Sequence, residues 1–251
     1  MDFRALADAL DPLVREAGDL AQAMRREGFV PERKSDGSVV TPADRAVEVM
    51  LREKLTALLP GSTVWGEEFG YEKPGPDGLW LVDPIDGTTN YSLGSPLWGV
   101  SIALIQGSDL VAGALALPDL GETYLGSRGR GASCNGMALP AIPEGKVTRS
   151  DLVGYCEAVV RMVPREKLPG KQRCAGAFVI EGAFMLQGRL RAMIGVREKL
   201  YDMAACALFA LELGAEVRYL DGGAMDFAKL ANDHKIERPW IMAPKGSGLG
   251  A

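Results

Sequence analysis

One stretch, residues 79–90, constrains this chain more than any other because it joins a buried strand to a cluster of polar groups. Residues 79–82 are Leu-Trp-Leu-Val, an unbroken apolar run that predicts a buried strand. The run ends at Asp83, and Asp86 follows after a proline and an isoleucine. Gly87 then breaks the strand pattern. The sequence therefore predicts that two carboxylates lie at the end of one strand.

Two interpretations of these polar groups are open. Carboxylates, carbonyls and retained water are the ligands that Mg²⁺ prefers, so Asp83 and Asp86 suit a magnesium site. Residues 87–90, Gly-Thr-Thr-Asn, can begin a turn or helix whose free N–H groups bind phosphate. The alternative is an Asp/Gly turn that satisfies its own hydrogen bonds.

The composition bounds the class of protein. A chain of 251 residues can form one large domain or two closely packed halves, and 47% hydrophobic with 24% charged residues is ordinary for a globular protein. The net charge of -5 and the lack of a basic tract argue against a nucleic-acid partner. No apolar run approaches the ~20 residues that span a bilayer. The first residues do not resemble a secretory signal, so we expect a cytoplasmic protein with no membrane partner.

The cysteine and histidine content limits the catalytic chemistry. The four cysteines are scattered without a Cys-x-x-Cys pair, which predicts reduced thiols. The single histidine, His234, lies in a polar stretch, and no Gly-x-Ser-x-Gly elbow accompanies it, so we interpret it as a solvated loop residue. Acid–base chemistry near neutral pH is then left to shifted carboxylates or to metal-bound water, and metal-bound water fits residues 83–90 better.

The rest of the chain alternates helix and strand patterns. Apolar residues at three- and four-residue steps predict a long first helix that ends near Gly28. Residues 140–147 are the predicted boundary between an N-terminal half, residues 1–140, and a C-terminal half, residues 141–251. The glycine-rich end of the chain is expected to be frayed. Strands are predicted near residues 64–66, 98–105, 110–117, 122–125, 152–155, 190–196 and 240–243, and a helix at 178–186.

Further acids can act either as structural groups or as ligands. Asp44 follows Thr41 by three residues, which is the capping-box position of a second helix. Glu67 and Glu68 lie between two aromatic residues, where two partly buried carboxylates would repel each other unless a cation is bound. A solvated surface pair is the alternative. Asp202 can cap the helix that follows it, or it can complete a metal site from the C-terminal half.

Three segments carry a resemblance to a known family. The string Asp-Pro-Ile-Asp-Gly-Thr-Thr-Asn at residues 83–90 resembles the first signature of the inositol monophosphatase family of Mg²⁺-dependent, lithium-sensitive phosphatases. Residues 201–205, Tyr-Asp-Met-Ala-Ala, resemble the second signature, and residues 129–136 resemble its Gly-x-Gly-Ala-x-x-Asn-Gly segment. The resemblance implies an α+β fold, a layered α-β-α-β-α sandwich. It also implies a phosphoric monoester hydrolase that forms a homodimer.

The resemblance implies a role for each candidate residue. Glu67 and Thr88 would orient the attacking water, and Asp44 would hydrogen-bond Thr88. The N–H groups of Gly87, Thr88 and Thr89 would hold the phosphate. Two or three Mg²⁺ ions are implied, with Mn²⁺ as a substitute and Li⁺ as an inhibitor, and they would reverse the negative sign of the site. The implied metal ligands are Glu67, Asp83, the carbonyl of Ile85, Asp86 and Asp202.

The substrate region departs from the family pattern. Ala177 stands where inositol-handling members carry a hydroxyl residue, and Gly195 stands in place of a carboxylate seven residues before Asp202. Both changes weaken the expectation of a strict inositol preference, because polyol recognition depends on satisfied polar contacts. We predict a small phosphorylated polyol or related metabolite as substrate, with Ala177 in its site. Histidinol phosphate, 3′-phosphoadenosine nucleotides and fructose 1,6-bisphosphate are the alternatives.

Two other classes of protein are alternatives to a phosphatase. The chain could be a catalytically idle, regulatory member of the family, although its set of predicted ligands is intact. It could also be an Mg²⁺-binding nucleotidyl enzyme, but it has no P-loop motif.

Overall fold

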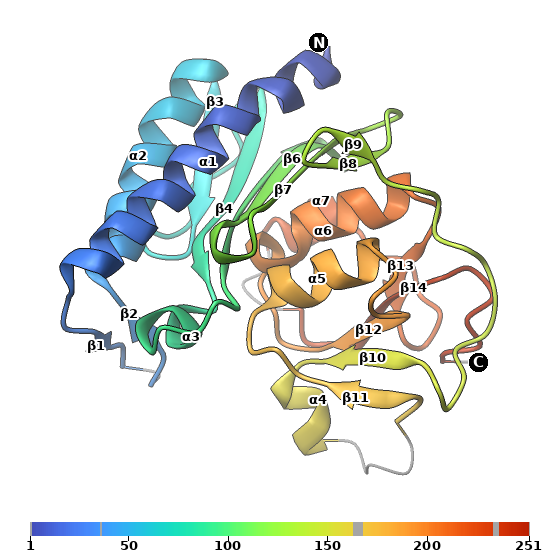
Figure 1. The fold of residues 1–251 in the computed structure, drawn as a ribbon. Helices are drawn as coiled ribbons and strands as arrows, with labels where there is room; N and C mark the ends of the chain where they lie inside the picture. The colour runs from blue at the N-terminus through green and yellow to red at the C-terminus, as the bar shows by residue number, and fades with distance from the viewer. Residues whose placement is uncertain (1, 36, 163–167, 233–235, 251) are drawn as a thin grey trace.

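The chain folds into five layers in the order α-β-α-β-α, as Figure 1 shows. The computed structural model describes residues 2–35, 37–162, 168–232 and 236–250. Helices α1 (Phe3–Glu27) and α2 (Pro42–Leu58) cover one face of a seven-stranded sheet. Helices α5 (Phe178–Leu186) and α6 (Leu200–Glu212) lie between this sheet and a five-stranded sheet. Helix α4 (Glu157–Met162) forms the outer layer, so the predicted layered α+β sandwich is confirmed.

The seven-stranded sheet has the order β3-β4-β5-β6-β7-β8-β9. Strands β3 and β4 run parallel, and all other neighbours in this sheet are antiparallel. The apolar run 79–82 is fully buried in β4 because helices cover both faces of the sheet. Its strands are β3 (Ser62–Gly66), β4 (Gly78–Asp86), β5 (Gly99–Gln106), β6 (Asp109–Leu117), β7 (Glu122–Ser127), β8 (Ala132–Cys134) and β9 (Met137–Ala138).

The five-stranded sheet has the order β11-β10-β12-β14-β13 and is built from the C-terminal part of the chain. The last strand in sequence, β14, pairs antiparallel with both β12 and β13. The predicted boundary 140–147 lies in the connection between the two sheets. The strands are β10 (Leu152–Tyr155), β11 (Lys171–Arg173), β12 (Ala192–Gly195), β13 (Glu216–Tyr219) and β14 (Trp240–Ala243).

The end of the chain is packed rather than frayed. Ser247 and Leu249 are buried, and the backbone N–H of Val147 donates to the carbonyl of Ser247 at 2.9 Å. Arg218 donates to the carbonyl of Leu249, also at 2.9 Å. The expectation of a frayed end is therefore wrong for residues 246–250, because long-range hydrogen bonds hold this glycine-rich segment.

Close contact between α6 and the seven-stranded sheet fixes the position of the C-terminal half. Phe209 on α6 is fully buried against Gly126 of β7 and Gly113 of β6. A Cβ atom at Gly126 would stand 2.5 Å from the Phe209 ring, so any side chain there would push α6 away from the sheet. This contact sets the helix that carries Asp202 against the sheet that carries Asp83 and Asp86.

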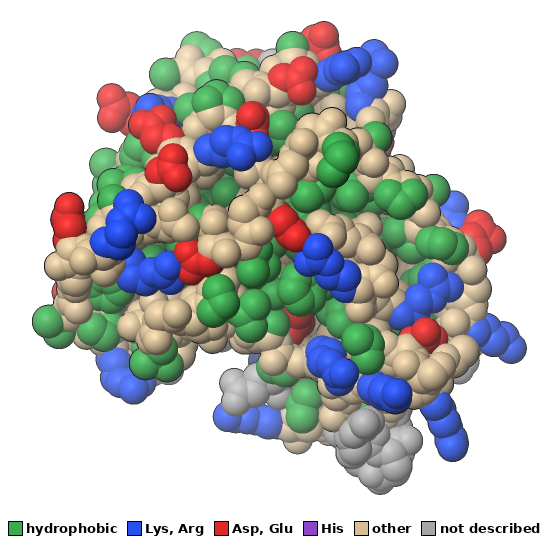
Figure 2. All heavy atoms as spheres, in the orientation of Figure 1, with side chains coloured by type: hydrophobic (Ala, Val, Ile, Leu, Met, Phe, Trp, Pro, Cys, Tyr) green, Lys and Arg blue, Asp and Glu red, His purple; other side chains and the backbone are tan. Residues whose placement is uncertain are grey.

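The surface of the protein carries charges of both signs. Basic and acidic side chains are interspersed on the face shown in Figure 2. The four cysteines all lie within the described residues and form no disulfide bond, whereas His234 lies outside those residues. Among the described helices, none is long and apolar enough to cross a bilayer.

The remaining short elements of the fold are β1 (Glu32–Arg33), β2 (Val39–Val40), α3 (Thr88–Ser92), η1 (Pro118–Leu120) and α7 (Phe227–Leu230).

Candidate active site

A pocket of about 490 Å³ opens at the end of β4. Asp83 and Asp86 reach it from β4, Glu67 from the loop after β3, and Asp202 from α6. The structure thus brings to one pocket acids that are separated by more than a hundred residues in the chain. The other predicted site residues that line it are Ile85, Gly87, Thr88 and Thr89.

The backbone at the end of β4 explains why both aspartates reach the pocket. Asp83 pairs with Ser101 and Asp86 pairs with Gly99, so the ladder to β5 is irregular between the two aspartates. Pro84 contributes to this irregularity because it has no N–H to donate. Gly87 then adopts a positive φ of 84° and caps α3. This conformation favours glycine over all other residues and turns the chain directly into the polar residues of α3.

Thr88 is held by a carboxylate from a distant helix. Its Oγ1 lies 3.1 Å from Asp44 Oδ1 and 2.9 Å from the carbonyl oxygen of Ile85. The other oxygen of Asp44 accepts hydrogen bonds from the backbone N–H and the hydroxyl of Thr41, at 2.8 and 2.5 Å. Asp44 therefore completes the capping box of α2 and also contacts Thr88. Burial raises the pKa of Asp44 to about 6, although the hydrogen bonds from Thr41 act in the opposite direction.

The charged forms of the three aspartates in the pocket are disfavoured by their surroundings. Burial and the nearby acids raise the pKa values of Asp83 and Asp202 well above the usual range for aspartate. Burial also raises the pKa of Asp86 to about 7, even though its Oδ2 accepts a 2.5 Å hydrogen bond from the N–H of Val179. Oδ1 of Asp83 is buried without a hydrogen-bond partner among the described residues. Such a site gains stability when a cation enters it.

The donor set fits a magnesium ion. Within residues 2–35, 37–162, 168–232 and 236–250, no three acidic, cysteine or histidine side chains are already drawn together as a ligand cage. Mg²⁺ does not require such a cage, because it keeps several waters and is usually held by one or two carboxylates together with substrate phosphate. The unpartnered oxygen of Asp83 and the acids that line the same pocket could hold an ion in this way.

Lys34 is a member of the pocket that the sequence analysis did not identify. Its ammonium group lies 3.1 Å from Glu67 Oε1 and 2.5 Å from Glu68 Oε1. Burial raises the pKa of Glu68, and the contact with Lys34 counteracts this shift. The segment around Lys34 has no periodic pattern, so the local sequence carries no signal that would place this lysine beside Glu67.

The loop that carries Glu67 is supported by a second acid, Glu48, which is fully buried in α2. The Glu48 carboxylate accepts hydrogen bonds from the backbone N–H groups of Glu68 and Phe69, at 2.7 and 3.2 Å, and pairs with Arg52 at 2.9 Å. The sequence analysis missed Glu48. The signal for it was a glutamate four residues before an arginine on one helix face.

Asp202 is the third residue of α6 rather than its N-cap. The helix begins at Leu200, and the backbone N–H of Lys199 donates to Asp202 Oδ2 at 2.7 Å. The expectation that Asp202 precedes the helix as its cap is therefore wrong, although the carboxylate still binds the N-cap backbone. Its place inside the first turn directs it toward the pocket that contains Asp83 and Asp86.

Ala177 does not line the pocket at the end of β4. It lies at the start of α5 and lines an adjoining pocket of about 620 Å³. Asp86, Gly176 and Asp202 line both pockets, so the two spaces are neighbours. A Cβ atom at Gly87 would stand 2.7 Å from the Cβ of Ala177, which shows how closely the two segments meet.

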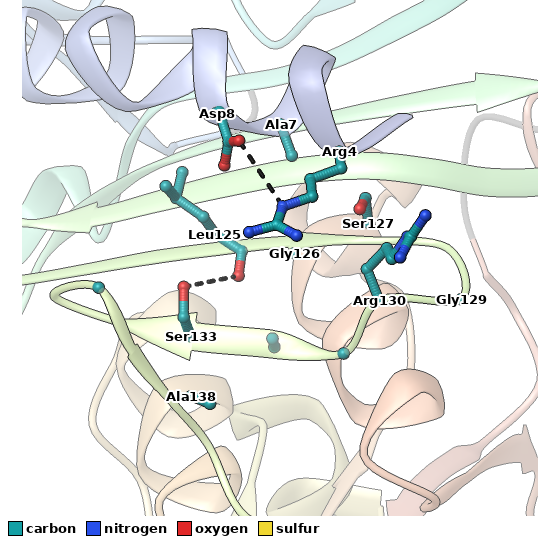
Figure 3. A pocket seen from close by; sticks show the side chains of 13 residues that line it. Arg4, Ala7, Asp8, Leu125, Gly126, Ser127, Gly129, Arg130, Ser133 and Ala138 are labelled. Carbon is teal, nitrogen blue, oxygen red and sulfur yellow. Dashed lines mark hydrogen bonds and ion pairs between the residues drawn. The ribbon is translucent and has the colours of Figure 1, made fainter. Parts of the chain in front are cut away.

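A third hollow lies between α1 and strands β7 and β8, as Figure 3 shows. Arg4 and Asp8 form an ion pair of 4.0 Å on its α1 side, and Arg130 lies on the side of the β7–β8 turn. None of the predicted site residues lines this hollow. This hollow is therefore separate from the two pockets that Asp86 and Asp202 line.

The layered fold and the acids that line the pocket at the end of β4 point to one class of protein, the phosphomonoesterases. More specifically, the chain belongs to the inositol monophosphatase family, whose family model matches residues 3–244. It is 32% identical to an inositol-1-monophosphatase of Mesorhizobium japonicum over 84% of this chain and 85% of that protein. It is 31% identical to a histidinol-phosphatase of Mycobacterium tuberculosis over 88% of this chain and 86% of that protein.

A solved structure supports the same fold. It is described as an IMPase/NADP phosphatase complexed with Mg²⁺ and phosphate, and it superposes with a TM-score of 0.82 at 21% identity. The match covers 98% of this chain and 93% of the other. The protein is accordingly a phosphoric monoester hydrolase of the inositol monophosphatase family.

Proposed function

We propose that the pocket at the end of β4 is the active site of a Mg²⁺-dependent phosphomonoesterase that acts on a small phosphorylated polyol or related metabolite. The observation that supports this most strongly is that Asp83, Asp86 and Asp202 line one pocket, that burial raises the pKa of each, and that one oxygen of Asp83 has no partner among the described residues. Without bound cations, the repulsion and desolvation of these carboxylates would lower the free energy of unfolding. In this proposal residues 1–140 and 141–251 act as one catalytic unit.

Each residue of the pocket has a proposed task. Bound Mg²⁺, in two or three ions, supplies positive charge for the phosphate and lowers the pKa of a water molecule. Thr88, held by Asp44, and Glu67 orient that water toward the phosphorus atom. The N–H groups of Gly87, Thr88 and Thr89 bind phosphate oxygens, because the first N–H groups of a helix lack partners within it. The proposed metal ligands are Glu67, Asp83, the carbonyl of Ile85, Asp86 and Asp202.

Several finer points are supported only by the family resemblance or by the composition of the sequence. We propose that Mn²⁺ substitutes for Mg²⁺ and that Li⁺ inhibits this protein. We also propose a homodimer in the cytoplasm, without a nucleic-acid or membrane partner. Relatives described as an inositol-1-monophosphatase and a histidinol-phosphatase are about equally similar, so the overall similarity favours neither substrate class.

The proposal is tested by measuring phosphate release from a panel of phosphate esters with Mg²⁺, with EDTA, and with Mg²⁺ plus LiCl. The panel contains myo-inositol 1-phosphate, histidinol phosphate, fructose 1,6-bisphosphate, 3′-phosphoadenosine 5′-phosphate and 4-nitrophenyl phosphate. We expect release that requires Mg²⁺ and is reduced by Li⁺. Equal release with EDTA, or none from any ester, would contradict the proposal.

A further inference from the structure

All the charged residues that line the pocket adjoining the proposed active site are acids. Its volume is about 620 Å³, and it shares Asp86, Gly176 and Asp202 with the pocket at the end of β4. A phosphate held at the end of β4 would therefore direct its alcohol part into this space. Two further acids, Glu181 and Glu198, line it, whereas no lysine or arginine does so among the described residues.

Glu198 occupies the space that a side chain at position 195 would need. A Cβ atom built at Gly195 would stand 2.9 Å from Glu198 Oε1, and it would also collide with the ring of Trp240. Trp240 is fully buried, so its ring cannot move aside without cost. The Glu198 carboxylate thus lies beside the point where a side chain at position 195 would begin.

The Glu198 carboxylate is fixed in position by its neighbours. Trp240 Nε1 donates a hydrogen bond to Glu198 Oε2 at 2.8 Å. Burial raises the pKa of Glu198, and interactions with Cys156 and Trp240 counteract this shift. These partners orient the carboxylate without neutralising its charge, because both side chains are uncharged.

Glu181 is the second acid of this pocket and is only 5% exposed. Its Oε1 accepts a 2.6 Å hydrogen bond from the backbone N–H of Ala175. No lysine or arginine in the described ranges forms an ion pair with Glu181 or Glu198. Burial raises the pKa of Glu181 to about 8, and the charges of Asp86 and Glu198 act in the same direction. The pocket therefore lacks a positive charge on the side away from the proposed metal ligands.

We infer that Glu198, assisted by Glu181, selects phosphate esters whose alcohol part carries a protonated amine over esters of neutral polyols. This inference rests on the proposed function and names its substrate class. An ammonium group donates charge-assisted hydrogen bonds to carboxylates, and these are stronger than the bonds that a neutral hydroxyl donates. A neutral polyol offers Glu198 only the weaker hydrogen bond of an uncharged hydroxyl.

A matched pair of substrates tests the inference. 2-Amino-3-hydroxypropyl phosphate and 2,3-dihydroxypropyl phosphate differ by one group, an ammonium in place of a hydroxyl. For the unmodified protein with Mg²⁺ at pH 7.5, we expect kcat/KM to be at least about tenfold higher for the amine, since one charge-assisted contact is worth about that factor. A ratio of one or below would overturn the inference.

Substitutions then assign the preference to Glu198. Glu198→Gln keeps an acceptor for Trp240 but removes the charge, and we expect it to lower the amine-to-hydroxyl ratio by about tenfold. The control Glu144→Gln changes an exposed acid outside the pocket and should keep the ratio of the unmodified protein. A folded Glu198→Gln protein with an unchanged ratio would overturn the inference. If Glu198→Gln does not fold, the amine-to-hydroxyl ratio of kcat/KM measured with the unmodified protein decides whether the inference stands.

The outcomes separate this inference from the proposed function. Mg²⁺-dependent hydrolysis of 4-nitrophenyl phosphate without preference for the amine ester overturns the inference and leaves the proposed function standing. Failure to release phosphate from 4-nitrophenyl phosphate and from both matched esters overturns the proposed function, and the inference with it.

Discussion

The carboxylate of Glu48 accepts a 2.7 Å hydrogen bond from the backbone N–H of Glu68, and this contact joins α2 to the loop that carries Glu67. Glu48 is fully buried, and Arg52 on the same helix neutralises it at 2.9 Å. The absence of a side chain at Gly66 leaves room for Glu48, because a Cβ atom there would collide with its carboxylate. A buried ion pair is thus used to position a proposed metal ligand rather than to bind substrate.

Replacing Glu48 by alanine should destabilise the protein. Arg52 would lose its buried partner and two loop N–H groups would lose their acceptor, so we expect the free energy of unfolding to fall by about 3–5 kcal/mol. Chemical denaturation of Glu48→Ala measures this change. Glu53→Ala alters an exposed acid on the same helix and should stay within about 0.5 kcal/mol of the unmodified protein. Equal stability of the two variants would show that Glu48 does not hold the loop.

Asp202→Asn should abolish turnover in a protein that still folds. The asparagine side chain still accepts the hydrogen bond from Lys199, and the substitution removes a negative charge from a repulsive cluster. We therefore expect the Tm without Mg²⁺ to equal or exceed that of the unmodified protein. Addition of Mg²⁺ should raise the Tm of the unmodified protein much more, because a ligand stabilises the state that binds it.

Asp86→Asn is expected to behave in the same way, and Asp8→Asn, an exposed change on α1, serves as the control. Phosphate release and thermal unfolding with and without Mg²⁺ measure both effects. Near-normal Mg²⁺-dependent activity in Asp86→Asn or Asp202→Asn would count against the proposed ligand set.

Thr88→Val should reduce kcat by on the order of 10²-fold, the contribution typical of a group that positions a reacting proton. Valine has the shape of threonine but lacks the hydroxyl that lies between Asp44 and the carbonyl of Ile85. Thr88→Ser retains this hydroxyl and should retain most of the activity. Steady-state kinetics with 4-nitrophenyl phosphate provide the measurement, and equal rates for the two variants would exclude a role for the hydroxyl.

The pH dependence of stability should include a contribution from Asp119. Burial alone would raise its pKa, but hydrogen bonds from Arg25, Trp98 and Gln22 outweigh burial and hold the pKa below its usual value of 3.8. Because the pKa is lower in the folded state, the stabilisation is present above the unfolded pKa and is lost as the pH falls through the folded one.

Asp119→Asn should therefore lower the free energy of unfolding by about 1.5–3 kcal/mol at pH 7, the range for hydrogen bonds to charged groups. The difference from the unmodified protein should shrink as the pH is lowered below about 4, where the carboxylate begins to protonate. Urea unfolding at pH 7 and at successively lower pH tests this. A difference that stays constant or grows toward acidic pH would contradict the assigned role.

The parts of the site that could be predicted from the sequence are those encoded within a few residues. The apolar run 79–82 predicts β4, and the residues that follow place Asp83 and Asp86 at its end. The capping box of α2 was also visible, because Thr41 and Asp44 are neighbours on one helical turn. In each case the interacting groups are close in the chain, so the local residue pattern and helix or strand geometry are enough to predict where they lie.

The parts that could not be predicted depend on contacts between distant segments. Glu198 and Trp240 together fill the space beside Gly195, and Trp240 is more than forty residues later in the chain. Lys34 reaches Glu67 from a segment without a pattern, and the glycine-rich end is held by Arg218. The identity of each of these residues, taken alone, does not distinguish it from a residue on an exposed loop.

The convergence of Asp83, Asp86 and Asp202 on divalent cations is tested most directly by X-ray diffraction from a crystal grown with Mn²⁺, using its anomalous scattering to locate the ions. We predict anomalous peaks in the pocket at the end of β4, within coordination distance of Asp86 and Asp202, and their loss in the Asp202→Asn protein. Peaks confined to other parts of the molecule, with the pocket empty in a crystal of active protein, would contradict the proposed site.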